Sequence, residues 1–234
     1  NIFYVLNSGD LNSRKILLLV LVSVWGLRLS IYLAYRNIGK GEDFRYQEFR
    51  RKFGPKRYWW FSYFQAFLLQ GALMILISST LLGMSFSSQP TTLSALDYIG
   101  IGIWLIGFIF EAGGDYQLMR FKKNTNNKGN VLTTGFWKYT RHPNYFAEWM
   151  VWNALIIISL PSLNAYFTNE GTLIGLGVLA SLLYVSRIMY TTLVYYTGAV
   201  PSEYYSVQKR PDYKKHQQTT NMFFPGKPKE EQSI

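Results

Sequence analysis

Two carboxylates and a cation recur at helical spacing in and beside one apolar stretch of the sequence. At 100° per residue, Glu111, Asp115 and Lys122 fall within about 40° of one another, so one face of a helix carries all three. Ionisable groups are costly inside a membrane and are functional candidates by default. We therefore expect this face to lead from the apolar interior to a polar site.

A second polar stripe follows in the next apolar stretch, where Asn144, Glu148 and Trp152 recur every four residues. Arg28 and Arg187 are the other ionisable residues inside apolar stretches. They leave an alternative open, in which the charged residues neutralise one another as structural ion pairs. Because both stripes lead toward the same basic segment, we favour a binding site over ion pairs alone.

The hexapeptide Thr-Arg-His-Pro-Asn-Tyr joins the two stripes. Its proline, Pro143, suits the first position of a helix, and a helix start offers free N–H groups and the positive end of its dipole. Lys138, Arg141 and His142 add cations there, and Asn144 can hydrogen-bond a ligand's polar edge. This chemistry suits a phosphate or carboxylate group, with lipid headgroups as the alternative ligand.

Composition excludes several classes of site. The chain has no cysteine, so disulfides, thiol nucleophiles and thiolate metal sites are excluded. It has only two histidines, His142 and His216, which excludes a histidine-rich di-iron centre, and we predict no metal site. The net charge of +11 follows membrane topology, so we expect no nucleic-acid partner.

Long apolar stretches predict an all-α, polytopic transmembrane helical bundle. A membrane-spanning helix needs about 20 apolar residues. The 234 residues are expected to form a single membrane domain, 1–234, with an N-terminal segment at 1–15. Five spans are predicted, at 16–36, 59–84, 97–117, 144–161 and 171–196.

The cations between the spans predict the orientation. Twenty of the 24 Lys and Arg residues lie in the loops 36–57 and 118–143 and in the tail 198–234. The two intervening loops, 85–96 and 162–170, carry none. By the positive-inside rule, the basic loops and the C-terminus face the cytoplasm or the mitochondrial matrix. A soluble bundle with a basic surface does not explain this alternation.

Several runs of residues together resemble one membrane protein family. They are Glu111 to Lys122 (EAGGDYQLMRFK), Asn127-Lys128-Gly129, Gly135 to Glu148 (GFWKYTRHPNYFAE), Trp25 to Leu29, Pro201-Ser202-Glu203 and Phe223-Phe224-Pro225. In these runs the chain resembles the steroid 5-alpha-reductase-like family, and within it the uncharacterised, bacterial-type branch. The similarity extends over about residues 15–225.

The resemblance implies an all-helical membrane fold that holds NADPH in a cytoplasm-facing cavity. Four residues match the family's cofactor contacts: Asp115, Lys122, Asn144 and Glu148. The others lie in matching segments. The full set of candidate cofactor-binding residues is Glu111, Asp115, Lys122, Tyr139, Arg141, His142, Asn144, Tyr145, Glu148 and Glu203.

The implied activity is NADPH-dependent reduction of a conjugated double bond in a lipid, steroid-like or another enone. Two departures concern the substrate side. Trp25 stands where the steroid reductases carry a tyrosine that polarises the substrate ketone. The chain also begins after the family's earlier helices, which we expect to be absent. No catalytic residue is assigned, and the lipid substrate is not identified.

Two other functions remain open. One is a non-catalytic accessory subunit that keeps the reductase fold within a larger membrane complex, in contact with membrane lipids and other subunits. The other is an S-adenosylmethionine-dependent lipid or prenylcysteine methyltransferase, because those enzymes share the Arg141-His142-Pro143-x-Tyr145 pattern. They resemble one another in a paired Glu-Glu near the C-terminus, where this chain has Ser202-Glu203.

Overall fold

The computed structural model describes residues 12–41, 44–85, 90 and 92–229. These residues form helices and loops, with no strand among them, which confirms the all-α prediction. The chain divides into two compact units, Asn1–Ser88 and Gln89–Ile234, so the single domain 1–234 stays a prediction. The first eleven residues of the predicted N-terminal segment lie outside the described residues.

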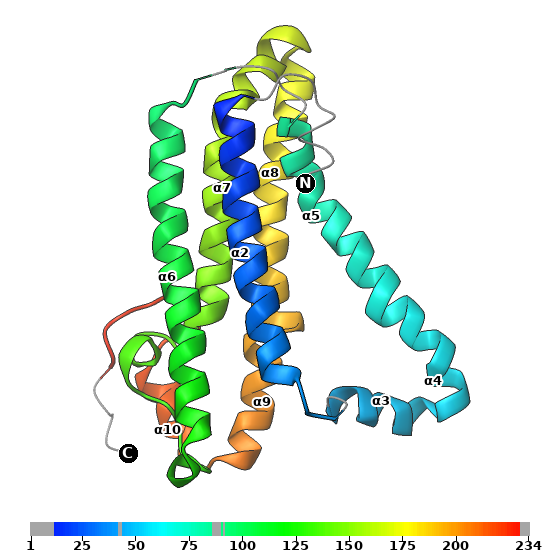
Figure 1. The fold of residues 1–234 in the computed structure, drawn as a ribbon, viewed down its shortest axis with the longest axis vertical. Coiled ribbons are helices and arrows are strands. Elements are labelled where there is room, and N and C mark those ends of the chain that lie inside the picture. The colour runs from blue at the N-terminus through cyan, green and yellow to red at the C-terminus, as the bar shows by residue number, and fades with distance from the viewer. Residues whose placement is uncertain (1–11, 42–43, 86–89, 91, 230–234) are drawn as a thin grey trace. The chain divides into compact units, whose positions relative to one another are not determined.

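Four helical segments of the described chain are long and apolar enough to span a membrane. They are α2 (Ser13–Asn37), α6 (Ala95–Lys123), α7 (Pro143–Asn169) and the segment Thr172–Lys209, which begins with α8 (Thr172–Thr191), as Figure 1 shows. The chain is therefore an integral membrane protein.

The predicted count of five spans is wrong. The segment predicted at 59–84 divides into α4 (Pro55–Ser62), a π-helix η1 (Tyr63–Leu68) and α5 (Leu69–Ser85). With 17 residues at about 1.5 Å each, α5 falls short of the hydrocarbon thickness of about 30 Å. Apolar composition alone could not reveal that a π turn interrupts the α-helix here.

Two other helices are longer than predicted. The α6 helix continues to Lys123, six residues beyond the predicted span, and α7 continues to Asn169. The predicted span ends at Pro161, but in the structure this proline lies inside the α7 helix. Membrane helices tolerate such a proline because neighbouring groups compensate for the lost hydrogen bond. Beyond α8 come the π-helix η4 (Thr192–Tyr196), α9 (Ala199–Lys209) and α10 (Tyr213–Thr219).

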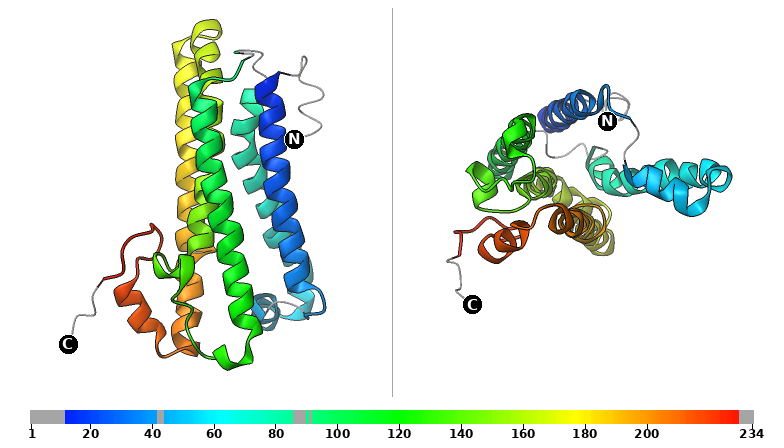
Figure 2. Two further views of the ribbon diagram at one scale, coloured as in Figure 1. Left: turned by 60° about the vertical axis from the view of Figure 1, so that its left-hand side comes forward. Right: turned by 90° about the horizontal axis from the view of Figure 1, so that it is seen from below.

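Three glycines on α6 bring this helix close to α7, which lies beside it in Figures 1 and 2. Gly100, Gly107 and Gly114 lie seven residues apart and face α7. A Cβ on Gly107 would lie 3.2 Å from the Ala147 carbonyl oxygen, and one on Gly114 would lie 3.3 Å from Pro143 Cγ. Without these side chains the two backbones approach closely, which places the first turn of α7 beside Asp115.

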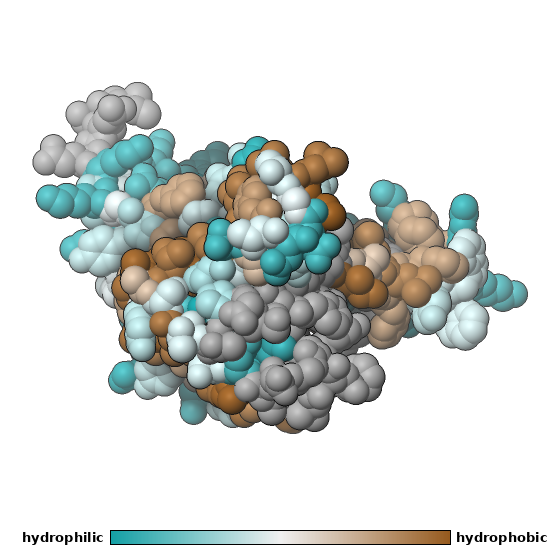
Figure 3. All heavy atoms as spheres, turned by 90° about the horizontal axis from the view of Figure 1, so that it is seen from above, coloured by the Kyte–Doolittle hydropathy of each residue, from teal (hydrophilic) through white to brown (hydrophobic). Residues whose placement is uncertain are grey.

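Large apolar side chains cover much of the outer helix surface. Leu173 is 84% exposed, Leu183 62% and Ile109 59%. In the end-on view of Figure 3, hydrophobic residues lie among hydrophilic ones. Such a surface suits lipid chains and is unusual for a protein in water.

Within the first unit, α3 (Phe44–Phe53) and α4 form a short helical hairpin, residues 44–62, joined at Gly54. Gly54 has a φ of +78°, which favours glycine. Ring contacts hold the two helices together, with centroids 6.3 Å apart for Phe49 and Tyr58 and 5.2 Å apart for Phe53 and Phe61. Tyr58 is buried as a result.

Candidate functional site

The loop that follows α6 folds back onto that helix. The Gln117 side chain accepts a hydrogen bond from Phe136 N at 3.0 Å, and Trp137 Nε1 donates to the Gly114 carbonyl at 3.1 Å. The rings of Phe110 and Phe136 pack 4.4 Å apart. These contacts fix the short 3₁₀ helix η3 (Gly135–Lys138), which carries Lys138.

The segment before α7 is hydrogen-bonded to the C-terminal tail. The fully buried Thr140 hydroxyl lies 3.1 Å from the Met222 carbonyl oxygen and 2.9 Å from that of Phe223. Arg141 N donates to Asn221 O at 2.9 Å, and Gly226 N donates to Tyr139 O at 3.0 Å. The tail is thereby held against the start of α7.

An aromatic cluster adds apolar contacts to these hydrogen bonds. It consists of Phe146 and Trp149 on α7, Tyr190 on α8, and Phe223 and Phe224 in the tail. Phe223 lies 5.1 Å from Tyr190 and 5.8 Å from Phe146, measured between ring centroids, and Trp149 lies 5.7 Å from Phe224. Edge-to-face aromatic pairs at such distances each add roughly 0.5–1.5 kcal/mol beyond their buried area.

A glutamate cluster lies beside this tail: Arg141, His142, Glu203 and Gln217. Arg141 Nε and Nη2 donate to the two Glu203 oxygens at 2.7 and 3.2 Å. Gln217 Nε2 donates to Glu203 Oε2 at 2.7 Å, and His142 Nε2 lies 2.9 Å from Oε1. Arg141 Nη1 also donates to the carbonyls of Gln217 and Thr220.

The structure thus brings together three of the predicted site residues, Arg141, His142 and Glu203. All three are buried. Their hydrogen-bonding groups contact one another and the tail, and none of the three belongs to the ion pairs of Arg28 and Arg187 that the sequence left open. Tyr145 belongs to the same region, since its ring stacks on His142 with the centroids 5.3 Å apart.

Both histidines are shifted toward the neutral form. Burial lowers the pKa of His142, and this outweighs the hydrogen bond and charge of Glu203, which raise it. Burial also lowers the pKa of His216 to about 4, with Arg141 as the next cause. Burial raises the pKa of Tyr213 on the same short helix. These groups are therefore uncharged at neutral pH.

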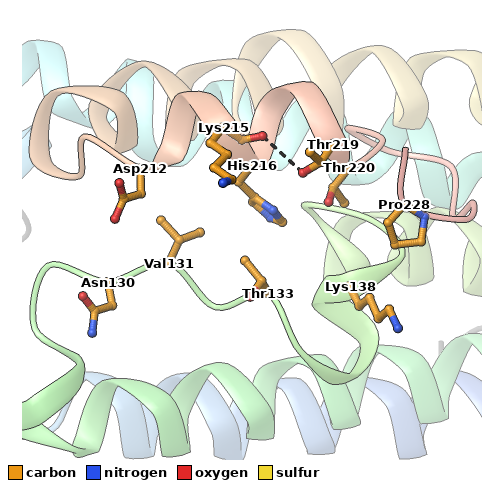
Figure 4. A pocket seen from close by; sticks show the side chains of 10 residues that line it. All are labelled: Asn130, Val131, Thr133, Lys138, Asp212, Lys215, His216, Thr219, Thr220 and Pro228. Carbon is orange, nitrogen blue, oxygen red and sulfur yellow. Dashed lines mark hydrogen bonds between the residues drawn. The ribbon is translucent and has the colours of Figure 1, made fainter. Parts of the chain in front are cut away.

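A basic cleft of about 610 Å³ opens between the loop after α6 and α10. Its lining residues are Asn130, Val131, Thr133, Lys138, Asp212, Lys215, His216, Thr219, Thr220 and Pro228. Figure 4 shows His216 pointing from α10 toward the loop that carries Val131 and Thr133, while Thr219 hydrogen-bonds the Lys215 carbonyl at 3.2 Å.

Cations outnumber acids around this cleft. Lys138 and Lys215 line it, against one lining acid, Asp212. Lys229 N donates to Thr219 O at 2.7 Å, so this part of the tail lies against the end of α10. The surplus positive charge favours an anionic ligand.

A smaller cavity of about 40 Å³ adjoins the basic cleft, because Val131 and His216 line both. Lys122, Arg141 and Arg210 also line it. This volume holds only one to a few waters. Lys122, predicted from the α6 stripe, is thereby placed next to the glutamate cluster.

The remaining predicted residues lie around the α6–α7 contact or on the surface. Glu111 and Asp115 are buried on α6, Glu148 is half-buried on α7, and Tyr139 is exposed. Asn144 stands in the first turn of α7, and its buried Oδ1 has no hydrogen-bond partner in the part of the chain that the structure describes. No group of three or more His, Asp or Glu in that part of the chain is arranged to hold a metal ion.

Sequence reasoning missed the residues that α10 contributes. A spacing of four residues separates Asp212, His216 and Thr220. The same spacing separates Lys215 from Thr219. This is the spacing that identified the stripes on α6 and α7. The signal was therefore present, but outside an apolar stretch polar residues are common and do not stand out.

Comparison with known proteins assigns the chain to a family. The pattern of the family described as a protein of unknown function, DUF1295, matches residues 1–220. The chain belongs to the DUF1295 family. It is also similar to an uncharacterized protein of Schizosaccharomyces pombe, at 25% identity over 64% of this chain and 50% of the yeast protein. The chain thus spans about half the length of that curated relative. No solved structure matches it.

Proposed function

We propose that this protein is an NADPH-dependent membrane reductase that acts on a conjugated double bond in a lipid, as its resemblance to the steroid 5-alpha-reductase-like family implies. The observation that carries the proposal is the basic cleft beside the start of α7. Its volume of about 610 Å³ falls in the range of roughly 300–1,000 Å³ that is usual for cofactor and ligand sites.

The groups around the cleft fit a phosphorylated dinucleotide. Lys138 and Lys215 supply positive charge, and the Thr133, Thr219 and Thr220 side chains supply hydroxyl groups for phosphate or ribose oxygens. Away from the cleft, at the α6–α7 contact, the buried Asn144 Oδ1 can accept a hydrogen bond from a ligand's N–H group.

When bound, NADPH supplies the hydride for the electron-poor carbon of the double bond, and the neighbouring carbon takes up a proton. The residues of the chain bind and orient. Lys138 and Lys215 neutralise phosphate charge, and Asn144 holds a polar edge. The close α6–α7 contact at Gly107 and Gly114 fixes the start of α7, which carries Asn144. The proton donor is not assigned.

The test is NADPH binding to the detergent-purified protein, followed by calorimetry and nicotinamide fluorescence. We expect Lys138→Gln/Lys215→Gln to weaken binding at least tenfold, since each charged hydrogen bond contributes about 1.5–3 kcal/mol. Lys128→Gln/Lys214→Gln is the matched control, because both lysines are exposed on the same elements and do not line the cleft. Equal loss in both variants contradicts the proposed site.

S-adenosylmethionine is titrated in parallel. Preference for it favours the methyltransferase. Binding of neither ligand favours the accessory subunit, for which the glutamate cluster is the specific support. Arg141, His142 and Glu203 hydrogen-bond one another and hold the tail, as expected where the fold is kept for its structure.

A further inference from the structure

The hairpin of residues 44–62 exposes a dense set of cations. Arg50, Arg51, Lys52, Lys56 and Arg57 are all exposed, and Glu48 is the one acidic residue in this stretch. Among the described residues, Arg51, Lys52, Lys56 and Arg57 form no ion pair. Within the described part of the chain, these four positive charges on one small element therefore have no ion-pair partner.

Exposed aromatic side chains follow these cations directly. Trp59 is 81% exposed and Trp60 49%, and on the adjoining π-helix η1 Phe67 is 68% and Phe64 52% exposed. The ring contacts that join α3 to α4 are made by Phe49, Phe53, Tyr58 and Phe61, while Trp60 contacts Phe61 and Phe64, which follow it in the sequence. Exposed tryptophans would be unfavourable in water and indicate a surface that something covers.

The order of residue types identifies what covers it. Cations come first, then tryptophans, then the apolar helix α5. Trp and Tyr concentrate at the membrane–water interface, and clusters of four to eight Lys and Arg beside an apolar helix attract anionic headgroups. An acidic protein surface would match the charge but gives no reason for the apolar residues that follow.

We propose that the hairpin is a binding element for anionic phospholipids, in which Arg51, Lys52, Lys56 and Arg57 contact the headgroups and Trp59 and Trp60 lie at the headgroup level. This role does not depend on the reductase activity or on the basic cleft, because all its residues belong to the first unit. The ligand is the phosphate-bearing headgroup of a bilayer lipid at the membrane surface.

The test uses the full chain in nanodiscs of phosphatidylcholine with a minor fraction of phosphatidylglycerol. Two preparations are compared. Brominated acyl chains, which quench nearby tryptophans, are carried by the phosphatidylglycerol in one preparation and by the same mole fraction of phosphatidylcholine in the other. The fluorescence quenching of Trp59 and Trp60 is the difference in quenching between the protein and its Trp59→Phe/Trp60→Phe variant. We expect the apparent association of phosphatidylglycerol near these residues to exceed that of phosphatidylcholine about fivefold, and 1 M salt to remove most of this preference.

Two charge variants locate the effect. Arg51→Gln/Lys52→Gln/Lys56→Gln/Arg57→Gln should bring the preference to about one while brominated phosphatidylcholine still quenches, which shows that the tryptophans remain at the membrane. Arg120→Gln/Lys123→Gln/Lys128→Gln/Lys214→Gln removes as many exposed charges elsewhere and should keep most of the preference. No preference in the unmodified protein, persistence in the first variant or equal loss in the second overturns the proposal.

Discussion

Glu203 accepts hydrogen bonds from two side chains and lies within hydrogen-bonding distance of a third. Its two oxygens bind the Arg141 guanidinium and the Gln217 amide, and His142 stands at 2.9 Å. Arg141 in turn holds backbone carbonyls of the tail. A buried ion pair is weak support for stability by itself, but removal of one partner leaves an uncompensated charge. The position of α10, and with it one wall of the basic cleft, thus depends on this carboxylate.

The first prediction follows from this dependence. Glu203→Gln leaves the buried Arg141 cation unpaired and should destabilise the attachment of the tail by about 3 kcal/mol. Hydrogen exchange of residues 213–226 in detergent measures the effect. The double variant Arg141→Met/Glu203→Leu should exchange more slowly than Glu203→Gln, because no buried charge is left alone. Equal or faster exchange in the double variant contradicts this explanation.

The second prediction concerns pH. The pKa of His216 is about 4 with the tail attached and near 6.5 when it is released, so the released form binds more protons between these values. Attachment should therefore weaken as pH falls from 6.5 toward 4, by up to about 1.4 kcal/mol per pH unit, and stay constant above 6.5. The lowered pKa of His142 acts in the same direction. Limited proteolysis of the tail at pH 7.5 and pH 5 measures the change.

His216→Gln provides the control for this pH effect. Glutamine keeps a polar side chain of similar reach but does not titrate, so the difference between pH 7.5 and pH 5 should shrink. The ionisable groups near His216, which are Arg141, His142 and Glu203, remain in this variant. An unchanged pH difference would assign the effect to His142 or to a carboxylate instead.

At the residue scale, one sequence reveals only part of this site. Spacing within a helix predicted Asp115, Lys122 and Asn144 as site residues, and of these Lys122 lines the smaller cavity. The pairing of Arg141 with Glu203 spans 62 residues, and the Thr140 contact with Phe223 spans 83. Such contacts depend on how the elements pack against one another, and this packing cannot be predicted from a local sequence pattern.

At the scale of elements, the α6–α7 pair is defined by its glycines, and the third prediction tests this. Gly107→Leu would place its Cβ 3.1 Å from Val151 Cγ2 and 3.2 Å from the Ala147 carbonyl, so the helices must separate. We expect a loss of about 1–3 kcal/mol, seen as a lower melting temperature in detergent. Gly102→Leu, five residues earlier on the same helix with nothing within 4 Å, should have little effect.

The elements themselves were largely predictable. Long apolar runs identified α2, α6, α7 and α8, because a membrane requires both length and apolarity of its helices. The same criterion failed at 59–84, since the π-helix at Tyr63–Leu68 leaves the apolar composition unchanged. The predicted end of α7 at Pro161 also came too early, because the effect of a proline on a membrane helix depends on the neighbouring helices.

At the scale of the whole molecule, the fourth prediction concerns the orientation in the membrane. The positive-inside rule places the loop after α6 and the C-terminal tail on the cytoplasmic side, and the turn between α7 and α8 on the other. The chain lacks native cysteine, so single cysteines can report this directly. Lys128→Cys and Lys227→Cys should react with an impermeant maleimide in inside-out vesicles, and Glu170→Cys in right-side-out vesicles. The reverse pattern contradicts the proposed orientation.

The contacts between residues 139–141 and 221–226 also set the order in which the protein can be completed during synthesis. When α6 and α7 have left the ribosome, the partners of Thr140 and Arg141 have not yet been translated. The membrane helices can therefore insert well before the basic cleft exists. Its second wall is formed by residues 212–228, so a chain stopped by a nonsense codon before residue 212 would reach the membrane without its proposed cofactor site.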